Sequence, residues 1–280
     1  MKPHPPATRP RMVYADHDPD PTLAPWIANL WTLAVPKQAA PFAHHVPPDG
    51  CTNLGFRAGL ALIIGPRIEP LTPPVAPGDR WLGVRFRPGA ARPFLDLPPR
   101  LVLKNRVVRA QEISGLSWAL DLANELAGCD GDAAVAIATE RLRGRSAVAR
   151  PPDPAVQASI RLILLQDGDE VPERALPTAS ELARAAHLSE RQLRRRFSAA
   201  VDLSPKELQT IWRFRRCAVE MAGRPEPSWS ALAAEHGFAD QSHLTREFRR
   251  LTGLTPGELA RQTAAIEHRR LLFPAPENEP

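Results

Sequence analysis

An internal repeat in the carboxyl-terminal half constrains the fold more than any other feature of this sequence. Residues 228–259 echo residues 178–208, and each copy has the apolar spacing of two helices separated by a tight turn. Two helices joined in this way form a helix-turn-helix unit. The sequence therefore predicts two such units in one chain. The matched positions are offset by 50 residues for Leu182 with Leu232 and Leu188 with Phe238, and by 51 for Leu193 with Leu244, Phe197 with Phe248 and Pro205 with Pro256.

Polar residues stand where the helices of the two copies should begin. Thr178 is followed three residues later by Glu181, which is the spacing of a capping box. Ser189 precedes the second helix of the first copy, and Asp240 precedes the second helix of the second copy. These caps predict second helices over residues 190–200 and 240–251.

One long helix, Ser204–Met221, is expected to join the two copies. Pro205 lies in its first turn, where the missing N–H costs nothing. At about 1.5 Å per residue such a helix spans about 27 Å, and one turn of DNA is about 34 Å. A rigid connection of this length can hold the two second helices against successive major grooves of a duplex.

The outward faces of the second helices carry side chains suited to DNA. Arginine binds guanine edges and phosphate, glutamine binds adenine, and hydroxyl groups bind either bases or phosphate. From Ser189 to Arg216 there are eight cations and three anions. The expected DNA contacts are Ser189, Arg191, Arg194, Arg195, Arg213, Arg216, Gln241, Ser242, Thr245 and Arg246. An ordinary solvated helix face is the alternative for these residues, and ion pairs within the domain are the alternative for Arg213 and Arg216.

Proline marks the domain boundaries. Of the 32 prolines, 23 lie in residues 1–154 and six lie in residues 155–272. Helix interiors exclude proline, so the second of these regions should be helical and the first should be rich in strands and loops. The expected division is a disordered tail over 1–20, a domain over 21–150, a proline-rich linker over 151–154, a helical domain over 155–272 and a disordered tail over 273–280.

Short strands and two helices are expected in the amino-terminal domain. The strands are 51–57, 60–64 and 81–87, and the last of them alternates so that Leu82, Val84 and Phe86 share one face. Their proline and glycine punctuation fits a β-barrel or a sandwich. Helical spacing recurs over 116–127 and 132–142.

Composition excludes several classes of protein. No apolar run reaches the ~20 residues of a membrane span, and the first residues lack the apolar core of a signal peptide. Cys51, Cys129 and Cys217 are scattered, which favours reduced thiols in the cytoplasm over a disulfide framework or a zinc site. Of the 36 cations, 32 are arginine, which suits an acidic partner such as nucleic acid.

Several residues of the amino-terminal domain allow more than one interpretation. A metal or cysteine–histidine site can be drawn from His44, His45, Asp49 and Cys51. Adjacent histidines do not share a strand face, so structural or ligand-pocket polarity is favoured there. The tryptophans Trp26, Trp31 and Trp81 are expected in the core, with an effector pocket as the alternative. For Leu116, Leu120 and Leu126 a core position and a dimer face are equally open.

The carboxyl-terminal pattern resembles the AraC family of bacterial transcription regulators. The residues that carry the resemblance are Leu188, Ser189, Leu193, Arg195 and Phe197, the run 203–205, the stretch 213–221, the run 237–248 and the run 253–256. One departure is Asp202, where the family usually has glycine and the second copy has Gly253. Aspartate tolerates the left-handed conformation that ends many helices, so the first unit should still form.

The amino-terminal half resembles the sensor or dimerisation half of one poorly characterised AraC-type subgroup. The resemblance rests on 25–31, 47–51 and 83–90. It implies an α+β chain: a cupin-like β-barrel followed by helices that dimerise, which would be 116–127 and 132–142, and then the all-α domain with two helix-turn-helix units.

The sequence and the resemblance together predict a cytoplasmic, sequence-specific transcription regulator that binds double-stranded DNA. No catalytic residue, metal site or cofactor is expected. A small-molecule effector, RNA polymerase and a second copy of the chain are left open as partners. One alternative is a metabolite-binding or enzymatic barrel with a regulatory helical domain, which would need a catalytic constellation in 21–110. Another is a DNA-binding protein whose amino-terminal half only docks a protein partner.

Overall fold

Six strands of the amino-terminal half form one antiparallel sheet in the computed structural model, which describes residues 12–39, 42–164, 176–223 and 228–264. The strand order is β1-β2-β7-β4-β5-β8. The strands are β1 Val13–His17, β2 Ile27–Ala34, β4 Asn53–Arg57, β5 Leu60–Ile64, β7 Arg80–Phe86 and β8 Val107–Arg109. A separate pair joins β3 Phe42–Ala43 to β6 Pro74–Val75. Two 3-10 turns, Pro21–Leu23 and Ala110–Glu112, also belong to this half. The prediction of a disordered tail over residues 1–20 is wrong for β1, because this strand pairs with β2 along its whole length. The tail predicted over 273–280 lies outside the described residues.

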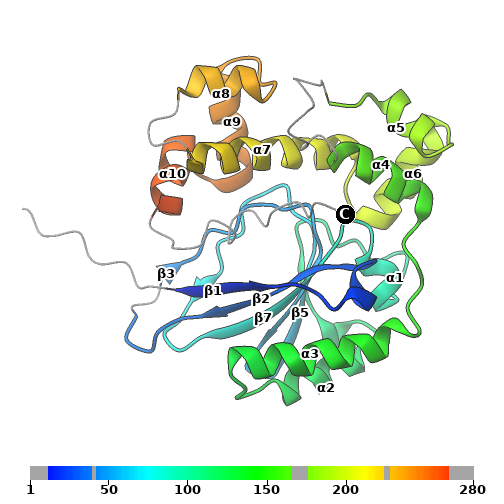
Figure 1. Cartoon of the computed structure of the whole chain (residues 1–280), viewed down its shortest axis with the longest axis vertical. Coiled ribbons are helices and arrows are strands. Elements are labelled where there is room, and N and C mark those ends of the chain that lie inside the picture. The colour runs from blue at the N-terminus through cyan, green and yellow to red at the C-terminus, as the bar shows by residue number, and fades with distance from the viewer. Residues whose placement is uncertain (1–11, 40–41, 165–175, 224–227, 265–280) are drawn as a thin grey trace, which may run out of the picture.

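One face of the sheet is covered by helices α2 (Ser117–Glu125) and α3 (Gly131–Ser146), as Figure 1 shows. The alternation predicted for β7 is confirmed, because Leu82, Val84 and Phe86 are all buried in this core. The short helix α1 (Ala91–Leu95) closes one end of the core. The helices predicted over 116–127 and 132–142 are confirmed as α2 and α3, with ends that differ by four residues or fewer.

The buried leucines of this region belong to the core. Leu116 and Leu126 lie in the same cluster as the sheet residues, and Leu120 packs against it partly buried. Burying these side chains against the sheet removes them from water. A dimer formed through α2 and α3 would therefore have to use their polar outer sides.

On the opposite face of the sheet, aromatic side chains pack against glycine residues of the strands. A Cβ on Gly83 would lie 2.0 Å from the ring of Trp31, so this ring lies directly on the backbone of β7. Trp31 stacks on Tyr14 with ring centroids 6.1 Å apart. Trp31 and Trp81 are half-buried here, whereas Trp26 packs against the main core.

The α+β class is confirmed, but the predicted barrel is an open sheet. Within the described residues β1 and β8 are its two edges and do not pair with each other. The physical reason is that helices α2 and α3, rather than further strands, cover the apolar face. A sheet can bury its apolar face by closing into a barrel or by packing against helices, and this sheet packs against helices.

Seven helices make up the described part of the carboxyl-terminal half. They are α4 Pro154–Leu164, α5 Ala179–Ala185, α6 Glu190–Val201, α7 Pro205–Gly223, α8 Trp229–Glu235, α9 Gln241–Thr252 and α10 Pro256–Ala264. Figure 1 shows α7 running between one group of helices, α4 to α6, and another, α8 to α10. The long joining helix predicted over Ser204–Met221 is thus confirmed, with one residue fewer at its start and two more at its end.

A single apolar core runs through both groups of helices. Leu193 and Phe197 of α6 and Leu244 and Phe248 of α9 are buried in it, in equivalent positions of the repeat. Phe248 meets Phe214 of α7 edge to face, with centroids 4.8 Å apart. Because both units pack on α7, this helix fixes the position of one unit relative to the other.

Candidate nucleic-acid interface

The second helix of the first unit begins at residue 190, as predicted, and that of the second unit begins at Gln241, one residue after the predicted start. Ser189 caps α6 and forms a capping box with Gln192: the Ser189 hydroxyl accepts from the Gln192 amide at 3.3 Å, and Gln192 Oε1 accepts from the Ser189 amide at 3.0 Å. Asp240 caps α9, accepting from the His243 amide at 2.6 Å. Thr178 and Glu181 form the expected capping box at the start of α5. These caps leave the amino-terminal turns of α6 and α9 at the surface.

The repeat extends to the backbone conformation of the turns. His187 (φ 52°) and Gly237 (φ 65°) occupy the same place in the two turns, and both have left-handed dihedrals. The second helices also end alike, at Asp202 (φ 60°) and Gly253 (φ 77°). The first unit therefore uses histidine and aspartate where the second unit uses glycine.

The outward face of α6 presents three arginines to solvent. Arg191, Arg194 and Arg195 are exposed, while Leu193 and Phe197 on the other side of the helix are buried. Within the described chain none of these three guanidinium groups has an ion-pair partner. Each keeps five N–H donors for phosphate or guanine. Their local charge is therefore not neutralised by the fold.

Arg196 behaves differently from its neighbours. Its guanidinium pairs with Asp153, with Nε and Nη2 at 2.9 and 2.6 Å from the two carboxylate oxygens. Burial by itself would raise the pKa of Asp153, but the hydrogen bond from Arg196 holds it below its ordinary value. This contact attaches α6 to the segment that links the two halves of the chain.

The outward face of α9 is less basic. Gln241, Ser242 and Arg246 are exposed at the beginning of the helix. Thr245 is half-buried, and its hydroxyl donates to the Gln241 carbonyl at 2.9 Å. Its oxygen still keeps acceptor capacity. The predicted contacts of α9 are therefore a mixture of amide, hydroxyl and guanidinium groups, whereas those within α6 are all guanidinium groups.

Two arginines of α7 lie close to the second unit. Arg213 is half-buried, donates to the Gly237 carbonyl at 3.2 Å and lies 4.7 Å from the ring centre of Phe238. Burial lowers the pKa of its guanidinium. Arg213 therefore stabilises the turn between α8 and α9. A phosphate contact would have to use N–H groups of the guanidinium other than the one that donates to Gly237. Arg216 is also half-buried and lies near His236.

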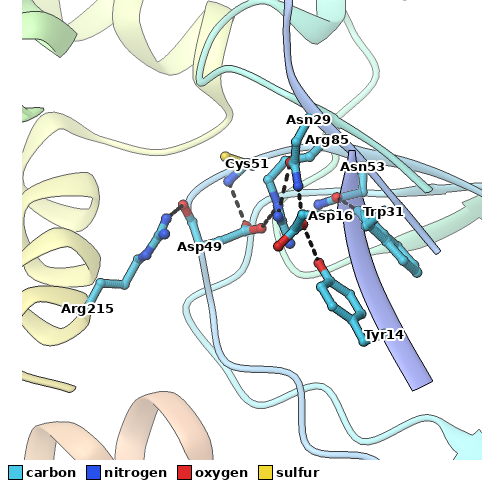
Figure 2. A network of polar contacts seen from close by, with 9 residues as sticks. All are labelled: Tyr14, Asp16, Asn29, Trp31, Asp49, Cys51, Asn53, Arg85 and Arg215. Atoms are coloured by element: carbon cyan, nitrogen blue, oxygen red, sulfur yellow. Dashed lines mark hydrogen bonds and ion pairs between the residues drawn. The ribbon is translucent and has the colours of Figure 1, made fainter. Parts of the chain in front are cut away.

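The polar residues near Cys51 form a buried network that the sequence did not predict (Figure 2). Asp49 accepts from Arg85 Nε at 2.8 Å, and Arg85 Nη1 donates to Asn29 Oδ1 at 3.1 Å. Asn29 and Tyr14 then both donate to Asp16. On the other side the Asp49 carbonyl accepts from Arg215 Nη1 at 3.3 Å, which extends the network to α7.

This environment suits structural polarity better than catalysis. Burial raises the pKa of the Cys51 thiol to about 12, which leaves it protonated and unreactive at neutral pH. Burial alone would lower the pKa of Arg85, but the neighbouring Asp49 carboxylate raises it, so this arginine stays charged. Among the described residues no group of three histidine, cysteine or acidic side chains could hold a metal ion.

Two protein families match separate parts of the chain. Residues 182–262 match a helix-turn-helix domain, and residues 15–108 match a domain of unknown function (DUF6597). A protein of Streptomyces antibioticus named as an AraC-like transcription regulator is 36% identical over 81 residues, which are 29% of this chain. The chain spans 26% of the length of that curated relative.

Solved structures resemble the chain at low sequence identity. ToxT from Vibrio cholerae O395 is 10% identical, with a TM-score of 0.42 over 95% of this chain and 98% of that one. The transcriptional regulator CdpR from Pseudomonas aeruginosa is 18% identical, with a TM-score of 0.32 over 66% of this chain and 46% of that one. No helix in the described ranges is long and apolar enough to cross a membrane.

Proposed function

Residues 182–262 form a helix-turn-helix domain of the AraC type, and from this we propose that the chain regulates transcription by binding duplex DNA through α6 and α9. In this proposal the two helices enter successive major grooves. The 19 residues of α7 span about 28 Å at ~1.5 Å per residue, close to the ~34 Å of one DNA turn.

The observation that carries the proposal is the exposed arginine cluster on α6. On α9, by contrast, Arg250 forms an ion pair with Glu247. Arg191, Arg194 and Arg195 have no such pairing within the described chain, and they stand just after the capped start of the helix. This is the part of a helix-turn-helix unit that contacts base edges. Ser189, Gln241, Ser242, Thr245 and Arg246 are proposed as further contacts, with Arg213 and Arg216 toward phosphate.

We assign the amino-terminal domain, from β1 (Val13–His17) to residue 150, a controlling role without catalysis. The polar network from Tyr14 to Arg215 supports this role, because it joins the sheet to the helix that carries both DNA-binding units. A small-molecule effector, RNA polymerase and a second copy of the chain are proposed as partners of the full regulator, in the cytoplasm.

Selection of bound sequences from random duplex DNA by the full chain tests the proposal. Arg194→Ala should weaken binding to the selected site by about 1–3 kcal/mol if the guanidinium contacts a base, and should leave binding to random DNA nearly unchanged. Arg109→Ala, at an exposed position of β8, is the matched control and should have no effect. An equal loss of affinity for selected and random DNA would show that Arg194 contacts phosphate and not a base. If the full chain selects no sequence, the proposed function is wrong.

A further inference from the structure

Asp202 occupies a position where glycine would be the easier residue. It ends α6 with φ 60°, and the matching residue of the second unit is Gly253 with φ 77°. Glycine adopts this left-handed conformation without steric cost, whereas aspartate only tolerates it. Helix termination alone therefore gives no reason for a carboxylate at this position. A reason has to come from what the side chain contacts.

The Asp202 carboxylate binds the amino-terminal domain. Both of its oxygens accept hydrogen bonds from Arg92, at 2.8 Å from Nη2 and with Oδ2 also 3.1 Å from Nε. Oδ1 further accepts from the backbone amide of Leu103 at 3.2 Å. The two side chains are only 6% and 11% exposed. Buried, bidentate pairs of this kind are strong and orientation-specific.

Arg92 is itself held in place by its own domain. It lies in α1, and its guanidinium also donates to the carbonyls of Pro98 and Leu101 in the following loop. A second ion pair lies beside it, from Lys104 to Glu207 in the first turn of α7. Burial by itself would raise the pKa of Glu207, but hydrogen bonds from Lys104 and Ser204 lower it. The loop over residues 98–105 thus contacts the junction between α6 and α7 through Leu103 and Lys104.

At the equivalent position of the second unit, Gly253 has no side chain that could form such an ion pair, and its neighbour in the amino-terminal domain is apolar. A Cβ on Gly253 would lie 3.6 Å from Pro70 Cγ, and Ile68 packs partly buried against the helical core. The amino-terminal domain therefore meets the carboxyl-terminal end of both second helices and leaves Arg191, Arg194 and Arg195 exposed. Docking of this domain restrains the helices without covering the side chains that would contact DNA.

We propose that Asp202 is a positioning residue that couples the amino-terminal domain to the first DNA-binding helix. Through Arg92 and the Leu103 amide it holds the end of α6 against α1 and its loop, so that a change in the amino-terminal domain alters how α6 meets its half of the binding site. Gly253, at the equivalent position of the second unit, has no side chain to form this pair, and the two half-sites therefore respond unequally. This inference rests on the proposed DNA-binding function.

Asp202→Gly provides a test that spares the fold. It inserts the residue that the second unit already has, so α6 keeps a well-tolerated helix end while the carboxylate is lost. Asp96→Gly is the matched control: Asp96 ends α1 with φ 54° and pairs with Arg150, but this pair is 70% and 67% exposed. Arg92→Gln and the double variant with Asp202→Gly complete a double-mutant cycle.

Affinity of the full chain is measured for its selected site and for sites with either half scrambled. We expect Asp202→Gly and Arg92→Gln each to weaken binding to the intact site about tenfold, because a charge-assisted buried contact is lost. Scrambling the α6 half should then cost the variants less than it costs the wild type, while scrambling the α9 half costs all of them the same. The double variant should be no weaker than either single variant, and Asp96→Gly should match the wild type.

Three results would overturn the inference: additive losses in the double variant, an equal reduction at both half-sites, or an effect of Asp96→Gly as large as that of Asp202→Gly. If the wild type selects no DNA, the proposed function fails instead. The same double-mutant cycle measured by urea unfolding then still tests the interdomain pair, and additive losses there would refute it.

Discussion

Removing the arginine cluster of α6 should make DNA binding much less sensitive to salt. The variant replaces Arg191, Arg194 and Arg195 by alanine in the full chain. All three side chains are exposed and lie opposite the buried face of the helix, so the substitutions remove charge without opening the core. Alanine also favours the helical conformation, which keeps α6 intact.

The magnitude follows from the number of guanidinium groups that are proposed to meet the DNA. These are the three arginines of α6, Arg246 on α9, and Arg213 and Arg216 on α7. If each displaces one counterion, the logarithm of the affinity falls with the logarithm of the salt concentration with a slope of about −5.4, so that affinity drops roughly 1,800-fold between 50 and 200 mM salt. With the three arginines that remain in the variant, the slope becomes about −2.7 and the drop becomes roughly 40-fold.

Fluorescence anisotropy of a labelled duplex, titrated at four or five salt concentrations, measures this slope directly. The matched control replaces Arg100, Arg106 and Arg109, which are exposed on the amino-terminal domain, and changes the net charge by the same amount. The control should keep the wild-type slope. A triple α6 variant whose slope stays within one unit of the wild type would show that α6 does not lie against the phosphates, and the proposed binding mode would be wrong.

Two further predictions concern the amino-terminal domain. Gly83→Ala should force Trp31 off the backbone of β7 and destabilise the fold by about 1–3 kcal/mol. Thermal unfolding and the near-ultraviolet signal of tryptophan measure this effect. The control is Gly144→Ala, in α3 with no atom near its added Cβ, which should instead stabilise the fold by about 0.5–1 kcal/mol, and equal effects of the two substitutions would contradict the packing of Trp31 on Gly83. Burial, with a smaller contribution from His45, lowers the pKa of His44 from 6.5 to about 4. As the pH drops through this interval the unfolded chain takes up the proton first, so the free energy of unfolding should fall. His44→Asn should flatten this fall in the free energy of unfolding with pH, and an unchanged pH dependence would show that another group causes it.

The elements of the helical half could be predicted because their signals are local. A cap acts on amides two or three residues away, and the apolar stripe of a helix repeats every three or four residues. Ser189, Thr178 and Asp240 therefore marked helix starts correctly, and the repeat correctly paired Phe197 with Phe248. The same reasoning identified Arg191 as lying on an outward face.

The amino-terminal half was less predictable. Alternation in β7 showed which residues face the core, but nothing in the spacing of the strands showed whether the sheet closes. Closure depends on which strands become neighbours, and β1 reaches β7 only through β2. The partners of charged residues were equally hidden, as with Asp49 and Arg85, which lie 36 positions apart.

By itself the sequence determined two capped helix-turn-helix units, the helix that joins them and the outward arginines, since each of these depends on contacts within one or two helical turns. Only the tertiary structure decided the role of Asp202. Its departure from glycine was visible in the sequence, but its partner Arg92 lies 110 positions away. A carboxylate can pair with any guanidinium that the fold brings near it, so its partner is set by the packing of one domain on the other.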